Sequence, residues 1–223
     1  MGTLYIVATP IGNLKDITLR ALEVLKTVDV IFAEDTRVTK KLLAHYGVAT
    51  RVERYDEHSH ARVAPQVAEL LRAGKSVALV TDAGTPGIAD PGARLIGFVR
   101  AELPTAQIVP IPGPSALAAA LSAAGIPAEH FTFAGYPPQK KGRQTFFLGL
   151  RHATLRPIVL YESPHRIART FGELGQVFGM DAELVVGREL TKIYEEFFRG
   201  DIKTALAYFT GERSKGEFVI IIP

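Results

Sequence analysis

The sequence predicts an α/β protein with two domains, and two observations lead to this fold class. Short apolar runs alternate with amphipathic helical segments up to about residue 112, which favours a mostly parallel sheet with helices on both faces. Beyond that point strands outnumber helices, and two neighbouring strands near the end are typical of a hairpin, so the second sheet should be mixed. We therefore expect α/β domains at residues 1–112 and 113–223, divided at the proline cluster near Pro112.

Local sequence patterns predict each strand and helix of the first half. Continuous apolar or β-branched runs predict its strands, which we place at residues 3–8, 30–33, 51–55, 77–80 and 107–111. Apolar residues at helical spacing predict its helices, which we place at residues 16–28, 36–47, 61–73 and 94–101. Asp16 and Asp35 are the candidate N-caps of the first two helices.

The second half is expected to begin with a helix of small residues. Residues 115–124 are almost wholly Ala, Leu and Ser, which either lets the helix approach a sheet or cofactor closely or reflects only the high helix propensity of Ala. Ser163 and Pro164 have the order of an N-cap followed by a first helical residue. We place strands at residues 131–134, 158–161, 184–186, 194–198 and 218–222.

Composition narrows the class of protein. The 223 residues are 47% hydrophobic and 22% charged, as is usual for a soluble globular protein. The formal charge of +3 permits a polyanionic partner without requiring one. The absence of cysteine excludes disulfides, thiolate catalysis and cysteine-based zinc sites. No segment resembles a signal peptide or approaches the ~20 apolar residues of a membrane helix, so we expect a cytoplasmic protein without a membrane partner.

The strand at residues 77–80 leads into a loop rich in Gly, Pro and Asp, ending at Gly92. In an open α/β sheet, ligands bind beyond the carboxyl ends of the strands, which is where Asp82, Gly84 and Thr85 should lie. Such a loop either holds a small molecule or makes a hard turn. The sequence contains neither the G-x-G-x-x-G fingerprint nor a P-loop.

Further polar groups follow other strands. Glu34, Asp35 and Arg37 either provide a general base and an anion clamp or form a helix cap with a surface ion pair. Asp56, His58 and His60 match no metal-ligand spacing, so a polar substrate contact by His58 is the preferred interpretation and no metal is expected.

The densest basic stretch, residues 139–143, includes Lys140, Lys141 and Arg143, with aromatic residues nearby. Charge neutralisation combined with stacking is typical of nucleic-acid grooves. A solvated loop beside core aromatic residues is the alternative.

Taken together, the strand-end motifs resemble the ribosomal RNA small subunit methyltransferase I family of the tetrapyrrole methylase superfamily. The resemblance covers the chain from Leu4 to Ile222. The motifs, in order, are ATPIGN, AEDTR, YDEHS, VTDAGTPGIADPG, PGPSA, FAGYPP, YESPHR and RELTKIYEE. The family implies two α/β domains with S-adenosylmethionine in the cleft between them, a homodimer, and methylation of a cytidine ribose 2′-hydroxyl in small-subunit (16S) ribosomal RNA, free or in the assembled 30S subunit.

The resemblance also implies site residues. Those matched to the cofactor pocket are Pro10, Asp82, Gly84, Thr85, Ile88, Ser115, Ala116 and Tyr161. The superfamily commonly has an acid where this chain has Thr85, which favours the ribosomal RNA branch over the porphyrinoid branch. Many members continue with a helical extension beyond the point where this sequence stops, so RNA binding here is expected to rely on the present residues or on a partner.

A ribose hydroxyl is a poor acid, so methylation needs a nearby proton acceptor. Our candidates for catalysis are Glu34, Asp35 and Lys192, with Arg37 and Arg166 as phosphate clamps. The first alternative function is methylation of a small tetrapyrrole, which would favour an apolar trough over a basic stretch. The second is a non-catalytic RNA-binding module, which would not depend on S-adenosylmethionine.

Overall fold

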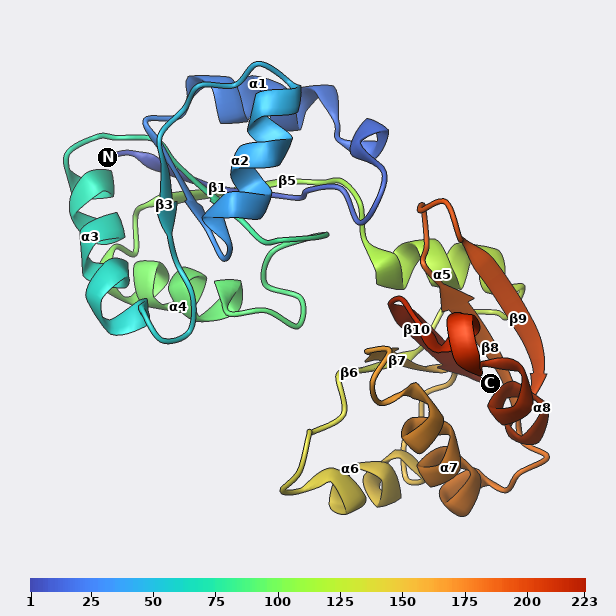
Figure 1. Ribbon diagram of the computed structural model, residues 1–223. Helices are drawn as coiled ribbons and strands as arrows, with labels where there is room; N and C mark the ends of the chain where they lie inside the picture. The colour runs from blue at the N-terminus through green and yellow to red at the C-terminus, as the bar shows by residue number, and fades with distance from the viewer. The chain divides into compact units, whose positions relative to one another are not determined.

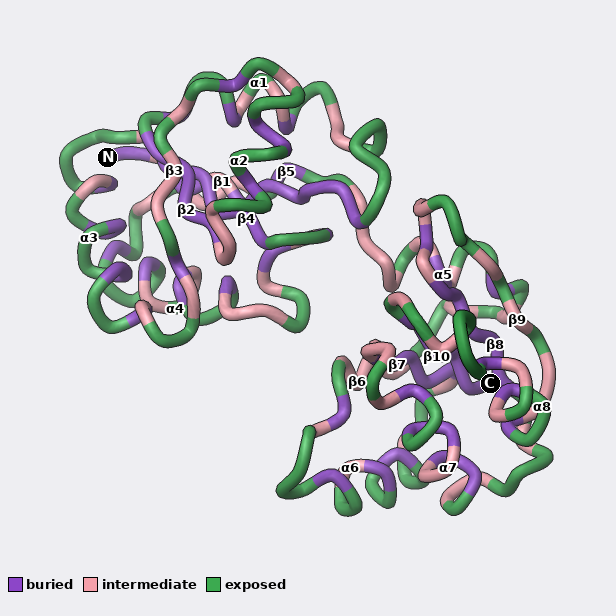
Figure 2. The backbone as a smooth tube through the Cα atoms, in the orientation of Figure 1, coloured by how far each residue is buried: buried purple, intermediate pink, exposed green.

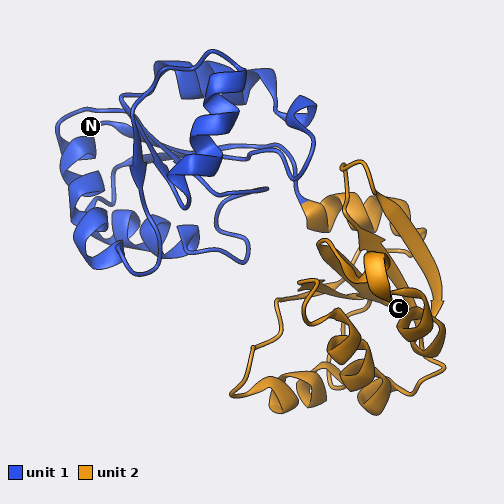
Figure 3. Ribbon diagram, viewed as in Figure 1, with its two compact units in different colours: residues 1–115 blue, residues 116–223 orange.

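The computed structural model describes residues 1–223, which form two compact units, Met1–Ser115 and Ala116–Pro223 (Figure 3). Each unit contains its own sheet and its own hydrophobic core. The chain leaves unit 1 after its last strand and enters unit 2 at the start of a helix.

Unit 1, which contains the N-terminus (Figure 1), is built on a five-stranded sheet. Its strand order is β3-β2-β4-β1-β5. Every pairing is parallel, which confirms the expectation for the first sheet. The carboxyl ends of all the strands therefore meet at one edge. The strands are β1 (Thr3–Val7), β2 (Val30–Ala33), β3 (Val52–Arg54), β4 (Val77–Val80) and β5 (Gln107–Ile111).

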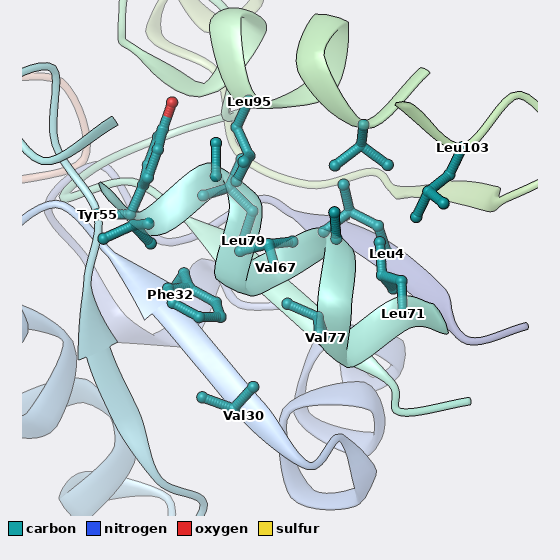
Figure 4. Packing of buried hydrophobic residues seen from close by; sticks show 14 of the residues in the cluster. Leu4, Val30, Phe32, Tyr55, Val67, Leu71, Val77, Leu79, Leu95 and Leu103 are labelled. Carbon is teal, nitrogen blue, oxygen red and sulfur yellow. The ribbon is translucent and has the colours of Figure 1, made fainter. Parts of the chain in front are cut away.

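Helices cover both faces of this sheet because successive strand residues point to opposite sides. Phe32 and Leu79 join the core under α3 and α4, together with Val67 of α3 and Leu95 of α4 (Figure 4). The alternate residues, such as Ile31, pack on the side of α1 and α2. The helices are α1 (Leu19–Thr27), α2 (Thr36–His45), α3 (His60–Arg72) and α4 (Gly92–Glu102), with a 3₁₀ turn η1 (Leu14–Asp16) before α1.

The N-caps of the first two helices have different outcomes. Asp35 caps α2 as expected, since its Oδ1 accepts a hydrogen bond from the Arg37 backbone N at 2.8 Å. Asp16 does not cap α1, because it lies in η1. Thr18 is the cap instead, and its hydroxyl accepts from the Ala21 backbone N at 3.1 Å.

Unit 2 has a five-stranded sheet in the order β6-β7-β10-β8-β9. Only β6 and β7 pair in parallel, so the expected mixed sheet with a terminal hairpin, β8–β9, is confirmed. Figure 2 shows the buried central strands of this sheet. The strands are β6 (Thr132–Gly135), β7 (Ile158–Glu162), β8 (Glu183–Arg188), β9 (Glu196–Asp201) and β10 (Phe218–Ile222).

One face of the second sheet forms a core with three helices, through residues such as Phe147, Phe171 and Ile202. The helix of small residues, α5 (Ala116–Ala124), packs against β10 and β8. The other helices are α6 (Arg143–Leu150), α7 (Ile167–Phe178) and α8 (Ile202–Tyr208), with a 3₁₀ turn η2 (Gly211–Ser214).

Two local predictions for unit 2 are wrong. The helix after the YESPHR motif begins at Ile167, so Ser163 does not cap it and Pro164 is not its first residue. The strand expected from Tyr194 begins only at Glu196, and Tyr194 lies in the exposed connection before it. None of the chain's helices combines the length and the apolar character that crossing a bilayer requires.

Candidate functional site

Two loops cross at the middle of the first sheet, beyond the carboxyl ends of β1 and β4. These strands are neighbours, yet β1 leads toward β2 on one side and β4 leads toward β5 on the other. Such a switch point is where open α/β sheets bind their ligands. Thr9 and Gly84 exchange two backbone hydrogen bonds there, at 2.9 and 3.0 Å, and the Thr9 hydroxyl donates to the Thr81 carbonyl at 3.0 Å.

The loop after β4 holds its own shape. The Asp90 carboxylate accepts from the backbone N of Gly87 at 2.9 Å and of Gly92 at 2.6 Å. The Thr85 hydroxyl donates to the Pro114 carbonyl at 3.1 Å, which ties the loop to the segment after β5. Gly84 has φ +85°, a conformation that favours glycine. The loop thus presents Ile88, 45% exposed, from a fixed backbone.

Glu34, directly after β2, is half-buried at the same edge of the sheet. The Thr81 hydroxyl donates to its Oε2 at 3.2 Å. Burial is the largest cause that raises the pKa of Glu34, and the negative charge of Asp82 adds to it. The hydrogen bond from Thr81 opposes the rise without cancelling it. Glu34 is therefore a stronger proton acceptor than an ordinary glutamate.

Its neighbour Asp35 has a different environment. Besides capping α2, the Asp35 carboxylate pairs with the Arg37 guanidinium at 2.6 Å. Hydrogen bonds from the Arg37 side chain and backbone hold the pKa of Asp35 well below its usual range. The Asp35 backbone N in turn donates to Asp82 Oδ1 at 2.9 Å, which joins the ends of β2 and β4. These contacts make Asp35 a positioning group and a poor base.

A hollow with a volume of about 680 Å³ opens beside Glu34, at the carboxyl ends of β2 and β3. Its lining includes Asp35, Arg37 and His58, so the structure brings four of the sequence-predicted site residues together. Arg54, which the sequence reasoning did not select, also lines it. We refer to this feature as the β2–β3 hollow.

His60 is separate from His58. It is buried, and its Nδ1 lies 2.9 Å from the Tyr55 hydroxyl. Burial lowers the pKa of His60. No group of three or more His, Cys, Asp or Glu side chains in the chain is arranged to hold a metal ion.

In unit 2, the Tyr161 hydroxyl accepts a hydrogen bond from the Leu117 backbone N at 2.9 Å. This contact fixes the Tyr161 ring beside the first turn of α5, next to Ala116. The rings of Phe133 and Tyr136 lie edge-on to Tyr161, with centroids 5.0 and 5.4 Å away. Ser115, the residue before α5, is the last residue of unit 1.

The basic stretch divides into exposed and buried residues. Lys140 and Lys141 are exposed, as expected of RNA contacts. Arg143 is only 1% exposed, because its guanidinium binds Glu173 at 2.7 Å and Thr170 at 2.6 Å. The prediction that Arg143 contacts RNA is therefore corrected: its charge is used inside unit 2.

The remaining cations are also engaged. Arg166 pairs with Glu162 at 2.7 Å and donates to the Pro137 carbonyl at 3.0 Å. Lys192 binds the carboxylates of Glu189 and Glu217 at 2.7 and 2.9 Å. Burial, the largest single cause, lowers the pKa of Lys192, but the hydrogen bonds to the two carboxylates and their negative charges together outweigh it, so the pKa is raised. Lys192 therefore stays protonated at neutral pH and is a poor base.

Sequence reasoning missed Arg54 and Thr81 at the first sheet and Glu162 in unit 2. Arg54 and Thr81 stand at the ends of predicted strands, which is a signal that could have identified them. No local pattern marks Glu162 as the buried partner of two arginines, because that role depends on α6 and α7 packing against β7.

The chain resembles known proteins over its whole length. Residues 3–206 match the family model of tetrapyrrole (corrin/porphyrin) methylases. It is 46% identical to ribosomal RNA small subunit methyltransferase I of Synechocystis, over 100% of this chain and 79% of that protein. The identity to the Thermotoga maritima protein of the same name is 40%, over 100% of this chain and 98% of that protein.

Solved structures share the fold. A uroporphyrin-III-C-methyltransferase from Thermus thermophilus superposes with a TM-score of 0.70 at 19% identity, covering 99% of this chain and 94% of that one. A diphthine synthase gives 0.75 at 14% identity, covering 99% and 90%. The family match, the relatives and the fold agree, and the chain belongs to the tetrapyrrole methylase family, in the group of the ribosomal RNA small subunit methyltransferase I proteins.

Proposed function

We propose that this protein transfers a methyl group from S-adenosylmethionine to the ribose 2′-hydroxyl of a cytidine in small-subunit ribosomal RNA. Membership of the family makes the chain an S-adenosylmethionine-dependent methyltransferase, and the relatives' name points to ribosomal RNA as its substrate. The observation that carries the proposal is Glu34, a half-buried carboxyl with a raised pKa that lines the β2–β3 hollow.

The residues at the proposed cofactor positions fit this cofactor. The fixed backbone around Gly84 and Thr85 provides a preformed surface, and Ile88 adds exposed apolar area. In unit 2 the ring of Tyr161 is held in place through Leu117. When bound, S-adenosylmethionine supplies an activated methyl group, so neither a metal nor a covalent enzyme intermediate is required. The proposed contacts are Pro10, Asp82, Gly84, Thr85, Ile88, Ser115, Ala116 and Tyr161.

Glu34 is our choice for the base among the three candidates. Its carboxylate would take the proton of the 2′-hydroxyl while the ribose oxygen receives the methyl group. Asp35 keeps its charge bound to Arg37, and Lys192 keeps its proton, so neither suits this role. Asp35 instead positions the end of β2 through its cap and its bond to Asp82.

The RNA contacts we propose are exposed side chains with matching charge or polarity: Arg37, His58, Lys140 and Lys141. Recognition of a 2′-hydroxyl requires RNA and an unstacked nucleotide. On the family resemblance we also propose a cytoplasmic homodimer that acts on 16S RNA or the assembled 30S subunit. Light scattering after gel filtration tests the dimer.

The direct test incubates the protein with methyl-labelled S-adenosylmethionine and small ribosomal subunits from a strain lacking this gene. We expect the label in 2′-O-methylcytidine after digestion of the RNA to nucleosides. Label only in an added tetrapyrrole precursor would instead support the first alternative function, methylation of a small tetrapyrrole. That alternative is suggested here by a structural likeness at 19% identity. RNA binding without any binding of S-adenosylmethionine would favour a non-catalytic module.

A further inference from the structure

The β2–β3 hollow combines acidic groups with two exposed arginines. Its volume of about 680 Å³ is within the ~300–1,000 Å³ of sites for small ligands. Ala33 of β2 pairs with Arg54 of β3, so these two strands end at adjacent points. One arginine near each strand end joins the lining: Arg37 in the first turn of α2 and Arg54 at the end of β3.

Arg37, in the first turn of α2, is held by the carboxylate of the helix N-cap, Asp35. Its Nε and Nη2 atoms donate to Asp35 Oδ1 and Oδ2 at 3.0 and 2.6 Å. The side chain is nevertheless 86% exposed. A guanidinium has five N–H donors, so this grip fixes its plane and leaves further donors for an anion.

Arg54 has the same arrangement on the neighbouring strand. Its Nε lies 2.6 Å from Asp56 Oδ2, and its side chain is 68% exposed. Asp56 is anchored by the Ser59 backbone N, which donates to its Oδ1 at 2.7 Å. Two exposed guanidiniums are thus preorganised by carboxylates, which lowers the entropy cost of binding a ligand.

We propose that the β2–β3 hollow binds one unstacked nucleotide of single-stranded RNA, with Arg37 and Arg54 holding the phosphates on its two sides. This subsite rests on the proposed function and extends it to a defined pair of phosphate contacts, one of them Arg54. The planar guanidinium fork matches phosphate oxygens better than an ammonium does. The hydroxyl and amino donors of the nucleoside suit the carboxyl of Glu34, which lines the same hollow.

The alternative is that both pairs are surface ion pairs without a ligand role, which is common for exposed pairs. The chain offers a matched control for this alternative. Arg51 pairs with Glu53 at 2.7 Å and is 75% exposed. It lies just before the first residue of β3, whereas Arg54 is the last residue of that strand. It lies about 10 Å along the strand from Arg54, away from the carboxyl edge.

The test compares Arg37→Ala, Arg54→Ala and the control Arg51→Ala in the full chain. Fluorescence anisotropy measures the Kd for a short single-stranded RNA with one cytidine over a series of KCl concentrations. We expect each of the first two substitutions to raise this Kd about tenfold and to reduce the slope of log Kd against log salt by about one. Arg51→Ala should change neither, and the Kd for S-adenosylmethionine should be the same in all variants.

Arg54→Lys should recover the salt slope but only part of the affinity, because it keeps the charge and loses the planar guanidinium fork.

Methyl transfer to small ribosomal subunits is measured in parallel, so that the nucleotide subsite and the proposed methyltransferase function can fail separately. A normal Kd and slope in Arg54→Ala, or an equal loss in Arg51→Ala, would overturn the subsite even if methylation is intact. If Arg54→Ala loses RNA affinity but the wild type does not methylate small subunits, the subsite stands and the proposed function is overturned. No RNA binding by the wild type overturns both.

Discussion

At the scale of single residues, two adjacent carboxylates have opposite properties. Glu34 is half-buried near Asp82, and its pKa is raised, whereas Asp35 is bound to Arg37, and its pKa is lowered. The difference arises because burial dominates at Glu34, whereas hydrogen bonds from Arg37 dominate at Asp35. Environments that separate the pKa values of neighbouring acids are the means by which enzymes assign a base.

We expect Glu34→Gln to lower kcat for small-subunit methylation by about 10²–10⁴-fold, because the amide cannot accept the hydroxyl proton. The Kd for S-adenosylmethionine should stay unchanged. In the wild type, kcat should rise with pH through a pKa above the ordinary glutamate value of 4.5 and then level off. Rapid-quench methylation assays over a pH series measure both effects.

The same substitution has a consequence for stability. Because folding raises the pKa of Glu34, its contribution to stability is present at low pH and is lost as the pH rises through the folded-state pKa. Glu34→Gln should therefore be more stable than the wild type at pH 8 and lose that advantage in acid, as urea unfolding can show.

The control for the predicted loss of kcat is Asp35→Asn, which keeps a capping oxygen and should retain most of kcat. Equal loss of kcat in both variants would contradict the assignment of Glu34.

At the scale of elements, unit 2 is held by ion pairs that join α6, α7 and β7. The buried Arg143 at the start of α6 binds Glu173 and Thr170 of α7 and lies 3.6 Å from Glu162 of β7. Arg143 also donates to the Pro138 carbonyl at 3.1 Å. These contacts anchor the loop that bears Lys140 and Lys141, so a buried cation supports the exposed ones.

We expect Arg143→Met to destabilise the protein by about 3 kcal/mol, since it removes the buried cation shared by Glu162 and Glu173. Glu162 keeps Arg166 and Glu173 keeps Arg169, which limits the loss. Combining it with Glu162→Gln should cost less than the sum of the two single substitutions, because the pair is coupled. Urea unfolding followed by circular dichroism measures these free energies. Lys140→Ala serves as the control and should change stability by less than about 0.5 kcal/mol. A cost below 1 kcal/mol for Arg143→Met would show that this network contributes little.

At the scale of the whole molecule, the two units have separate cores and separate hydrogen-bonded sheets. Unit 1 completes its parallel sheet with β5, which pairs with β1 along five residues. We expect a fragment of residues 1–115 to fold by itself and to unfold in one cooperative transition, because its core is internal.

Thermal unfolding monitored by circular dichroism, together with dispersed amide resonances, tests this expectation. A fragment of residues 1–102 is the matched control. It lacks β5, so it exposes the edge of β1 and should aggregate or lose the cooperative transition. A non-cooperative 1–115 fragment would mean that unit 1 depends on unit 2 for its stability.

Much of the fold could be predicted from the sequence. The alternation of β1 to β5 with helices, the parallel first sheet and the terminal hairpin β8–β9 follow from side-chain periodicity and from the length of each connection. The strand-end positions of Glu34 and Asp82 follow from the same local pattern. The start of α7 (Ile167–Phe178) could not be predicted. The YESPHR turn before it has the residue types of a helix start but is not helical.

The sequence by itself determined the class of fold, the family and the groups available at the carboxyl ends of the strands, since these depend on residues near one another in the chain. The tertiary structure alone decided which groups meet. Asp82 bonds to Asp35 across 47 positions of sequence because β4 lies beside β2. Arg143 turns inward because acidic partners from α7 and β7 surround it. Strand order and burial arise from distant contacts, which local patterns do not encode.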